Sequence, residues 1–193
     1  MVRSLLLAGG RSSRMGEDKA LVKIDGEAMI ARVARALAEA GREPIRIAVA
    51  RPEDVDRYGT VIGEELQVEW VLDGNIHAGP IDALVEALED PQCEDLETMQ
   101  LAPVDVPWIS AGLFWSLEEG LGELDALIMP HDGERSHPLL ALIRPQRILK
   151  MIGDGDRRPL HVQFSEAQHS VLVENPQVLR NVNHPEDLER DLS

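Results

Sequence analysis

The chain opens with an apolar run that ends in a glycine-rich, basic loop: Ser4-Leu5-Leu6-Leu7-Ala8-Gly9-Gly10-Arg11-Ser12-Ser13-Arg14-Met15-Gly16, closed by Lys19. Residues 4–8 are predicted to form a buried strand, because four of the five are apolar and the glycines stop the run. Glycines let backbone N–H groups approach phosphate oxygens, and Arg11, Arg14 and Lys19 supply positive charge. An ordinary turn with solvated arginines is the simpler interpretation. The Gly9-Gly10 pair, two arginines and a lysine within eleven residues nevertheless favour a phosphate-binding loop, although neither the Walker nor the dinucleotide spacing is present.

Farther along the chain, short apolar runs alternate with amphipathic patterns. Further strands are predicted at residues 45–50, 68–72, 99–102, 126–129, 139–143 and 171–173. Helices are predicted at residues 27–40, 53–58, 80–88, 110–121, 145–151 and 184–192. This alternation is typical of βαβ units with right-handed crossovers. The sequence therefore predicts an α/β fold, a single three-layer α/β/α Rossmann-like domain over residues 1–193 with a mainly parallel sheet.

The composition limits the kind of partner. The net charge is −16, from 35 acidic and 19 basic residues, which serves solubility and repels phosphate backbones and anionic membranes. Neither nucleic acid nor a membrane is therefore expected as a partner. Aromatic residues make up 3% of the chain, and Trp70, Trp108 and Trp115 are expected in the core, Trp108 with partial exposure. The single cysteine, Cys93, lies in an acidic run and is expected to be an inert surface thiol. Without a long apolar stretch or a secretory leader pattern, the cytoplasm is the expected location.

Three polar loops follow predicted strands, after Ala8, after Leu72 and after Ala102. Because ligands bind at the carboxyl ends of parallel strands, these loops locate the site. Asp105 is predicted to bind Mg²⁺, which prefers one or two carboxylates together with phosphate oxygens. A turn or helix-cap aspartate is the alternative. Asp73 either accepts hydrogen bonds from the N1–H and the exocyclic amine of guanine or simply belongs to a turn, and the residues leave both open.

Five motifs resemble, in order, those of the molybdenum cofactor guanylyltransferases, which belong to the nucleotidyltransferase superfamily. The first is the loop from Leu7 to Gly16 with Lys19. The others are Gly79-Pro80, the segment Pro103-Val104-Asp105-Val106-Pro107, the late loop His131-Asp132-Gly133-Glu134-Arg135-Ser136-His137-Pro138 and the C-terminal segment Asn181-Val182-Asn183-His184-Pro185-Glu186-Asp187-Leu188. Each motif is modest by itself, but together they span nearly the whole chain in the family's order.

The resemblance implies a reaction between GTP and a phosphorylated molybdopterin cofactor that yields the guanine dinucleotide form and pyrophosphate, with Mg²⁺ as the metal. It implies that the catalytic residues are Lys19, Arg14 and Asp105, and that Asp105 holds the metal. It implies nucleotide contacts from Leu7, Ala8, Gly9, Gly10, Lys19, Asp73, Gly79, Pro80 and Asp105. It implies acceptor contacts from Arg135, His137, Asn181 and Asn183. Transient contacts with other molybdenum cofactor proteins are also expected.

The late asparagines stand where related pyrophosphorylases carry a second metal-binding carboxylate. One magnesium ion, or a second metal held mainly by phosphates, is therefore expected. A strand over residues 181–183 would direct Asn181 and Asn183 to one side and Val182 to the core. Capping of a terminal helix that begins at Pro185 is the alternative for Asn183.

The chain departs from the family pattern at two places. Asp82 adds a negative charge after Gly79-Pro80, and Ala50-Arg51-Pro52 replaces an asparagine that follows the second strand, where Arg51 could contact ribose or phosphate. These departures keep three alternatives open: a cytidylyltransferase for the same cofactor, a non-catalytic GTP-binding module of cofactor maturation, and a guanylyltransferase for a sugar phosphate or phospholactate. The Gly9-Gly10 pair favours guanine, because cytidylyl relatives tend to read Leu-Ala-Ala-Gly.

Overall fold

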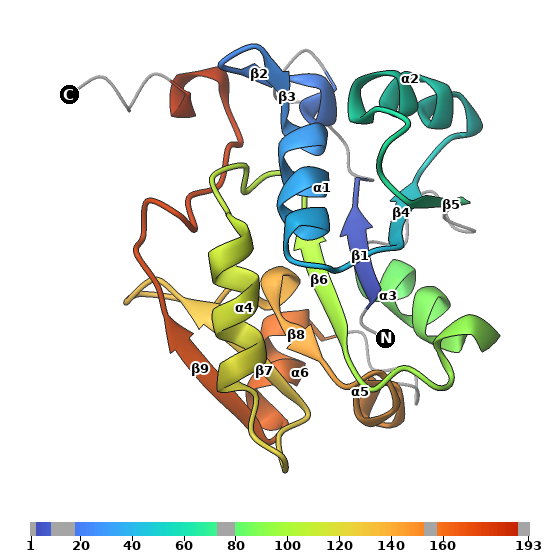
Figure 1. Cartoon of the computed structure of the whole chain (residues 1–193). Coiled ribbons are helices and arrows are strands. Elements are labelled where there is room, and N and C mark those ends of the chain that lie inside the picture. Colours follow the sequence, from blue (N-terminus) through green and yellow to red (C-terminus); the bar gives the residue numbers. More distant parts are fainter. Residues whose placement is uncertain (1–2, 9–17, 73–79, 153–157, 189–193) are drawn as a thin grey trace.

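The structure is a computed structural model and describes residues 3–8, 18–72, 80–152 and 158–188 (Figure 1). In this part of the chain, seven strands form one sheet in the order β5-β4-β1-β6-β8-β7-β9. The strands are β1 (Arg3–Leu7), β4 (Ile45–Val49), β5 (Val68–Leu72), β6 (Met99–Pro103), β7 (Leu127–His131), β8 (Leu142–Ile143) and β9 (His169–Val173). All neighbouring pairs are parallel except those that β8 makes with β6 and β7. The predicted α/β fold with a mainly parallel sheet is confirmed.

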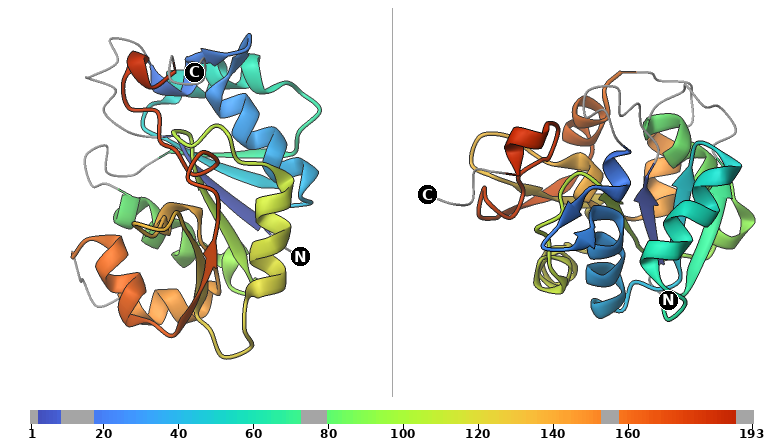
Figure 2. Two further views of the ribbon diagram at one scale, coloured as in Figure 1. Left: turned by 90° about the vertical axis from the view of Figure 1, so that its left-hand side faces the viewer. Right: turned by 90° about the horizontal axis from the view of Figure 1, so that it is seen from above.

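Helices cover both faces of the sheet, and Figure 2 shows the sheet between the two helical layers. One layer consists of α1 (Met29–Glu39), α2 (Pro52–Ile62) and α4 (Ala111–Gly120), and the other of α3 (Pro80–Glu89), α5 (Pro145–Ile152) and α6 (Leu160–Glu166). Successive side chains of β1 point to opposite faces of the sheet, so Leu6 packs against the first layer of helices, and Leu5 and Leu7 pack against the second. Burial of apolar side chains on both faces is what a parallel sheet requires.

Several short elements join these layers. They are the 3₁₀ turns η1 (Lys19–Leu21), η2 (Pro91–Cys93), η3 (Pro138–Leu140) and η4 (Pro185–Asp187), and the hairpin of β2 (Lys23–Ile24) and β3 (Glu27–Ala28). None of them extends beyond three residues, so each serves as a connector or cap.

Some predicted elements differ from the observed ones. Residues 139–143 form η3 and the short β8 rather than one strand, because the N–H groups of Leu140 and Ala141 donate to the carbonyl oxygens of His137 and Pro138 at 3.0 and 3.2 Å and close a 3₁₀ turn. Within the described residues, the predicted terminal helix is the single turn η4. Helix α6 was not predicted, because its sequence carries no clear apolar period.

Two predictions for single residues are wrong. Cys93 is buried, with 3% of its surface exposed, and the Arg46 guanidinium Nη1 lies 3.5 Å from its Sγ. The turn η2, capped by Asp90, directs the thiol inward. Trp115 is 51% exposed, because Phe114 and Leu117 are the α4 side chains that face the sheet.

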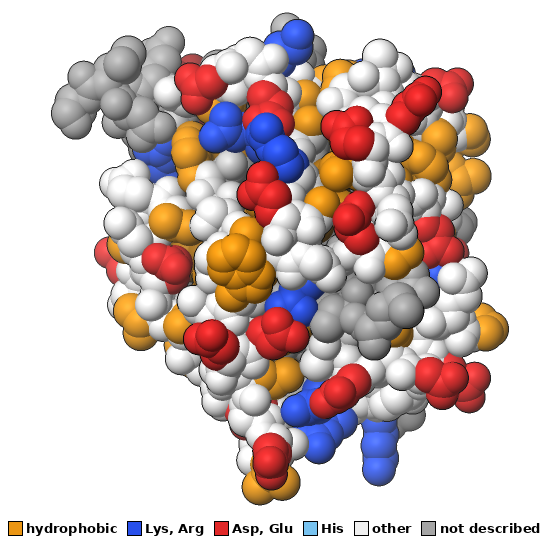
Figure 3. All heavy atoms as spheres, viewed as in Figure 1, with side chains coloured by type: hydrophobic (Ala, Val, Ile, Leu, Met, Phe, Trp, Pro, Cys, Tyr) orange, Lys and Arg blue, Asp and Glu red, His pale blue; other side chains and the backbone are white. Residues whose placement is uncertain are grey.

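One face of the molecule carries charges of both signs. Figure 3 shows acidic and basic side chains interspersed over the face formed by α1 and α4. Among the described residues, no helix combines the length and the apolarity needed to cross a membrane.

The direction of the strands defines one functional edge. Because β1, β4, β5, β6, β7 and β9 run parallel, their carboxyl ends lie at the same edge of the sheet. The strands β1, β5 and β6, which precede the loops that were predicted to form the site, all end at this edge.

Candidate functional site

Asp105 lies in the loop that follows β6, and three different parts of the fold hold this loop. The Val104 N–H donates to the carbonyl oxygen of Leu7 at 3.4 Å, which fixes the loop to the end of β1. The Val182 N–H donates to the carbonyl oxygen of Asp105 at 2.8 Å, and Arg32 Nε of α1 donates to the carbonyl oxygen of Pro107 at 3.3 Å. The position of the Asp105 carboxylate is therefore set by β1, α1 and the C-terminal segment together.

The side chains of Lys19, Asp105 and Asn183 meet at this point and are called the lysine cluster below. Lys19 Nζ lies 3.3 Å from Asp105 Oδ2 and donates to Asn183 Oδ1 at 2.8 Å. The side chains of Lys19 and Asp105 are 19% and 24% exposed, so they are held by the fold and still reached by solvent. Two oxygen atoms from distant segments thus converge on one cation at the carboxyl edge of the sheet.

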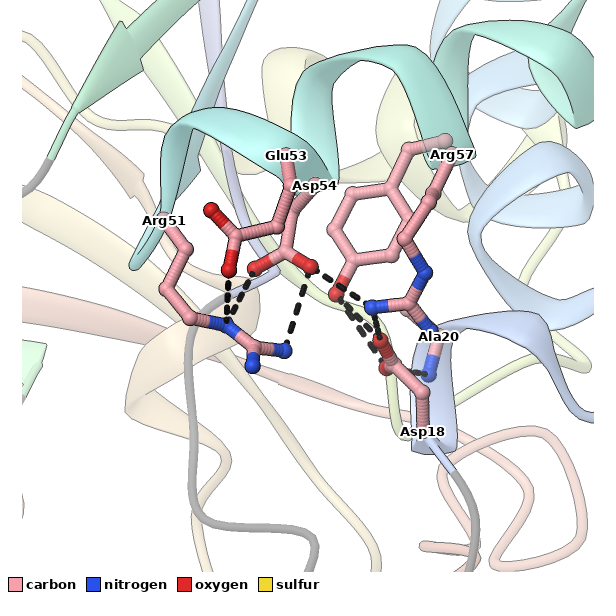
Figure 4. A network of polar contacts seen from close by, with 7 residues as sticks. Asp18, Ala20, Arg51, Glu53, Asp54 and Arg57 are labelled. Atoms are coloured by element: carbon pink, nitrogen blue, oxygen red, sulfur yellow. Dashed lines mark hydrogen bonds and ion pairs between the residues drawn. The ribbon is translucent and has the colours of Figure 1, made fainter.

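A polar network behind the lysine cluster fixes the residue before Lys19 (Figure 4). The Asp18 carboxylate caps η1 by accepting from the Ala20 N–H at 3.2 Å. It also accepts from the Tyr58 hydroxyl at 2.9 Å and pairs with Arg57 Nη1 at 3.1 Å. Burial, followed by the neighbouring Asp18 carboxylate, raises the pKa of Tyr58 well above its usual range, so the hydroxyl stays protonated and donates. Helix α2 therefore anchors the segment that presents Lys19.

Arg51 belongs to the same network, on the side of β4. Its Nε and Nη2 both donate to the Asp54 carboxylate at 3.3 Å, and Arg57 Nη1 contacts the same carboxylate at 2.7 Å. Asp54 is buried, whereas the Arg51 side chain is 53% exposed. The contact of Arg51 with ribose or phosphate stays a prediction, and the structure ties this arginine to the start of α2.

The late loop, residues 131–138, is closed by its own side chains around Asp132. The backbone N–H groups of Glu134 and Arg135 each donate to Asp132 Oδ1 at 2.9 Å. His137 Nε2 lies 2.8 Å from Asp132 Oδ2, and Arg135 Nε lies 3.5 Å from the same oxygen. Burial raises the pKa of Asp132, but the Arg135 N–H, the His137 ring and the Glu134 N–H outweigh it and hold the pKa well below its usual range.

The two predicted acceptor residues of the late loop differ in accessibility. The His137 side chain is 8% exposed, and its ring is engaged with Asp132. The Arg135 side chain is 65% exposed, so most of its guanidinium faces solvent. Arg135 is therefore accessible to a ligand and the His137 ring is largely enclosed, and the acceptor contacts of both residues stay predictions.

The C-terminal segment resolves the alternative for Asn183. The N–H groups of Asn183 and His184 donate to Asp187 Oδ2 at 2.8 and 2.9 Å, so Asp187 caps η4. The Asn183 side chain instead contacts Lys19. Val182 is fully buried and Asn181 is partly buried, as the predicted alternation requires, although the segment is not a strand.

The remaining predicted site residues are placed as follows. Leu7 and Ala8 are buried and end β1 at this edge, and the Ala8 N–H donates to the Ala48 carbonyl oxygen at 3.2 Å. Pro80 begins α3. The positions that lie outside the described residues are Gly9, Gly10, Arg14, Asp73 and Gly79.

Sequence reasoning missed the residues that support the site rather than those that form it. They are Asp18, Arg32, Arg57, Tyr58 and Asp187. Asp18 carried a usable signal, because an aspartate directly before a short helical turn is a common cap. Tyr58 and Arg32 reach the site through tertiary packing and carried none.

The lysine cluster suits a hard divalent cation. Among the described residues, no three His, Cys, Asp or Glu side chains form a group that could hold a metal ion by themselves. Mg²⁺ needs no such group, because it takes one or two protein oxygens and completes its shell with substrate phosphates and water. The Asp105 carboxylate and the Asn183 amide oxygen, which already share one cationic partner, fit this requirement.

Comparisons with known proteins agree over most of the chain. The model of the MobA-like NTP transferase domain family matches residues 4–169. A molybdenum cofactor guanylyltransferase from Photobacterium profundum is 28% identical over an alignment of 191 positions, which covers 96% of this chain and 93% of the relative. A probable molybdenum cofactor guanylyltransferase from Opitutus terrae is 30% identical over an alignment of 195 positions, which covers 96% of this chain and 92% of the relative. A solved nucleotidyl transferase from Methanothermobacter has the same fold, with a TM-score of 0.78 at 17% identity over 98% of this chain and 95% of that chain.

Proposed function

The chain belongs to the family of MobA-like NTP transferase domains, and on this premise we propose that it transfers GMP from GTP to a phosphorylated molybdopterin cofactor, with release of pyrophosphate and with Mg²⁺ as the metal. The names of its relatives support the acceptor and the guanine base. The pair Gly9-Gly10 in the first loop also favours guanine over cytosine.

The meeting of Lys19, Asp105 and Asn183 is the observation that carries this proposal. An ammonium group and two oxygen ligands lie together where β1 and β6 end. A nucleoside triphosphate needs positive charge and a metal at its phosphates, and an otherwise acidic protein must supply both locally. The cluster offers the ammonium group of Lys19 and two oxygen atoms that could hold a metal, on residues that the family resemblance selects.

The proposed reaction is a single in-line displacement. A phosphate oxygen of the acceptor forms a bond to the α-phosphorus of GTP. The bond between this phosphorus and the oxygen that bridges to the β-phosphate breaks, and its electron pair leaves with pyrophosphate. The chain positions two anionic substrates and stabilises the charge on the phosphates. Bound Mg²⁺ supplies Lewis-acid polarisation of the phosphate oxygens.

Each residue of the cluster then has a distinct role. Asp105 holds the metal, assisted by the amide oxygen of Asn183. The Lys19 ammonium, together with Arg14, neutralises the triphosphate and the leaving pyrophosphate. By the resemblance, Leu7, Ala8 and Gly9 would contact the nucleotide through their backbone, and Gly10 would contact the phosphates. The network around Asp18 keeps Lys19 in place.

The acceptor is proposed to bind on the side of the C-terminal segment and the late loop. Asn181 and Asn183 offer amide groups, and the exposed guanidinium of Arg135 offers a charge for the acceptor's phosphate. His137 contributes through the shape of the late loop, because its ring contacts Asp132. Contacts with other molybdenum cofactor proteins stay a prediction.

Pyrophosphate release from Mg-GTP in the presence of the phosphorylated molybdopterin cofactor tests the proposal directly. We expect release that requires both the acceptor and Mg²⁺, and formation of the guanine dinucleotide by mass spectrometry. Tighter binding and faster turnover with CTP would overturn the choice of guanine. Binding of GTP without any pyrophosphate release would instead identify a non-catalytic module.

A further inference from the structure

The C-terminal segment, residues 174–188, carries Asn183 from the end of β9 to the lysine cluster. It contains turns and η4 but no α-helix or strand. Figure 1 shows this segment, in red, running beside the β2–β3 hairpin. Regular backbone bonds therefore do not fix Asn183, and other contacts must hold it beside Lys19.

One such contact joins the segment to the Asp105 loop. The guanidinium carbon of Arg180 lies 4.1 Å from the centroid of the Trp108 ring, which is the distance of a stacked cation–π pair. Trp108 follows Asp105 by three residues, and Arg180 precedes Asn183 by three residues. The stack thus joins the two segments that carry the oxygen ligands of the cluster.

A small apolar cluster lies under the same region. Val22, Met29 and Val182 are buried in it, and Ile24, Trp108 and Leu188 pack against it. Val22 follows the turn that presents Lys19, and Val182 adjoins Asn183. The apolar cluster therefore lies next to the segments that carry Lys19, Asp105 and Asn183. Trp108 packs against it, and Arg180 stacks on the Trp108 ring.

We propose that Arg180 is a positioning residue, which acts by stacking on Trp108 to hold Asn183 in register with Lys19 and Asp105. The inference rests on the proposed function, because it concerns the geometry of that transferase site. Arginine suits the role better than lysine, since its planar guanidinium stacks on an aromatic ring while its side-chain nitrogens still make hydrogen bonds. Arg180 Nη1 lies 3.5 Å from Gln177 Oε1 within the segment.

The test compares Arg180→Met with Arg180→Lys and with a matched control. Methionine keeps an unbranched, flexible stem but removes the charge and the planar group. Lysine keeps the charge but loses the planar stack. Arg147→Met is the control, because Arg147 is an exposed arginine of α5 whose hydrogen bonds go to the carbonyl oxygens of Asp125 and Glu123, outside the lysine cluster and the C-terminal segment. Trp108→Leu probes the other partner while keeping apolar bulk in the cluster.

Two measurements are made on each variant, and only one of them needs activity. Hydrogen exchange reports the protection of the Val182 and Asn183 amides, which donate to Asp105 and Asp187. Steady-state kinetics with direct GTP binding separates turnover from affinity. For Arg180→Met we expect faster exchange at these amides, turnover lowered about tenfold and GTP affinity within about twofold of wild type. Arg180→Lys should recover part of both effects, and the control should change neither.

Three results would overturn the inference. The first is exchange at the Val182 and Asn183 amides of Arg180→Met at the wild-type rate. The second is faster exchange with unchanged turnover, which would make the stack merely structural. The third is an equal loss of turnover in Arg147→Met. If wild type itself transfers no guanylyl group, the proposed function fails, and the exchange comparison still decides whether the stack orders the segment. If Arg180→Met does not fold, Arg180→Lys and Trp108→Leu carry the same comparison.

Discussion

The lysine cluster and the late loop lie at the same edge of the sheet, but they are built in different ways. Lys19 meets Asp105 across 86 residues and Asn183 across 164 residues. In the late loop, Asp132 is bound by groups two, three and five residues away. The cluster exists only when the whole sheet is assembled, whereas the loop closes on itself.

This difference separates binding residues from residues that hold a shape. Polar groups that form hydrogen bonds with residues a few positions away stabilise a turn, and these groups are then less available to bind a ligand. Polar groups brought together by the fold, and still reached by solvent, can exchange their partners for a substrate. Substitutions in the cluster should therefore affect catalysis more than stability, and substitutions of the enclosed groups of the late loop, such as Asp132, should do the reverse.

The largest effect is expected from Asp105→Ala. Loss of the carboxylate should lower kcat/KM for pyrophosphate release by at least about a hundredfold, because this side chain holds the metal. The melting temperature should stay close to that of wild type, since the contacts that fix the loop use main-chain atoms of residues 104, 105 and 107. Asp56→Ala, which removes an exposed carboxylate on α2, is the matched control. Wild-type activity in Asp105→Ala would remove the metal role from Asp105.

Substitutions of Lys19 and Asn183 are expected to lower turnover somewhat less, and their effects should not be additive. Lys19→Met should lower turnover by roughly fiftyfold and Asn183→Ala by roughly tenfold, because each loses charge or orientation at the phosphates. The double variant should lose less than the product of the two, because the side chains contact each other at 2.8 Å. Lys23→Met removes an exposed lysine of the hairpin and serves as the control. Full additivity in a double-mutant cycle would mean that the two side chains act independently.

Tyr58→Phe tests whether the support behind the cluster matters. The change removes only the hydroxyl that donates to Asp18, and the buried ring stays. The free energy of unfolding should fall by about 1 kcal/mol, and turnover should fall about threefold because Lys19 is held less firmly. Urea unfolding and steady-state kinetics measure the two effects. Thr60→Val, which removes an exposed hydroxyl of the same helix, should leave turnover unchanged.

The sequence predicted the sheet, because the apolar runs of its strands are a local pattern. The apolar runs indicated the strands, and Asp105 lies in the loop that begins where one of these strands ends, after Pro103. The contact between Lys19 and Asn183 could not be read from spacing, because it depends on how the C-terminal segment packs. For the same reason Asp18 and Tyr58 were missed, and the burial of Cys93 was predicted wrongly. The extent of the domain, residues 1–193, and the chemical roles of the site residues stay predictions.

Arg135→Met sharpens the comparison within the late loop. The guanidinium is 65% exposed and is the part of this loop that can reach a ligand. We expect the KM for the acceptor to rise about fivefold, with turnover and GTP affinity close to wild type, because only one charge-assisted contact is lost. An unchanged KM for the acceptor would assign the whole late loop to structure. A loss of GTP affinity would place it at the nucleotide instead.

Asp132→Asn should have the smallest effect on catalysis and a measurable effect on stability. The amide oxygen of asparagine can still accept from the backbone, but the charge that faces His137 and Arg135 is lost, so the free energy of unfolding should fall by about 1–2 kcal/mol. The pKa of Asp132 is lowered in the folded chain, so its charge stabilises the fold above the unfolded-state pKa of about 4, and this contribution is lost as the pH falls below that value. The stability difference between wild type and the variant should therefore be full near neutral pH and should shrink on acidification below about pH 4. Urea unfolding of both proteins between pH 7 and pH 3 measures this difference. A difference that stays constant over the whole range would mean that the charge of Asp132 does not hold the late loop.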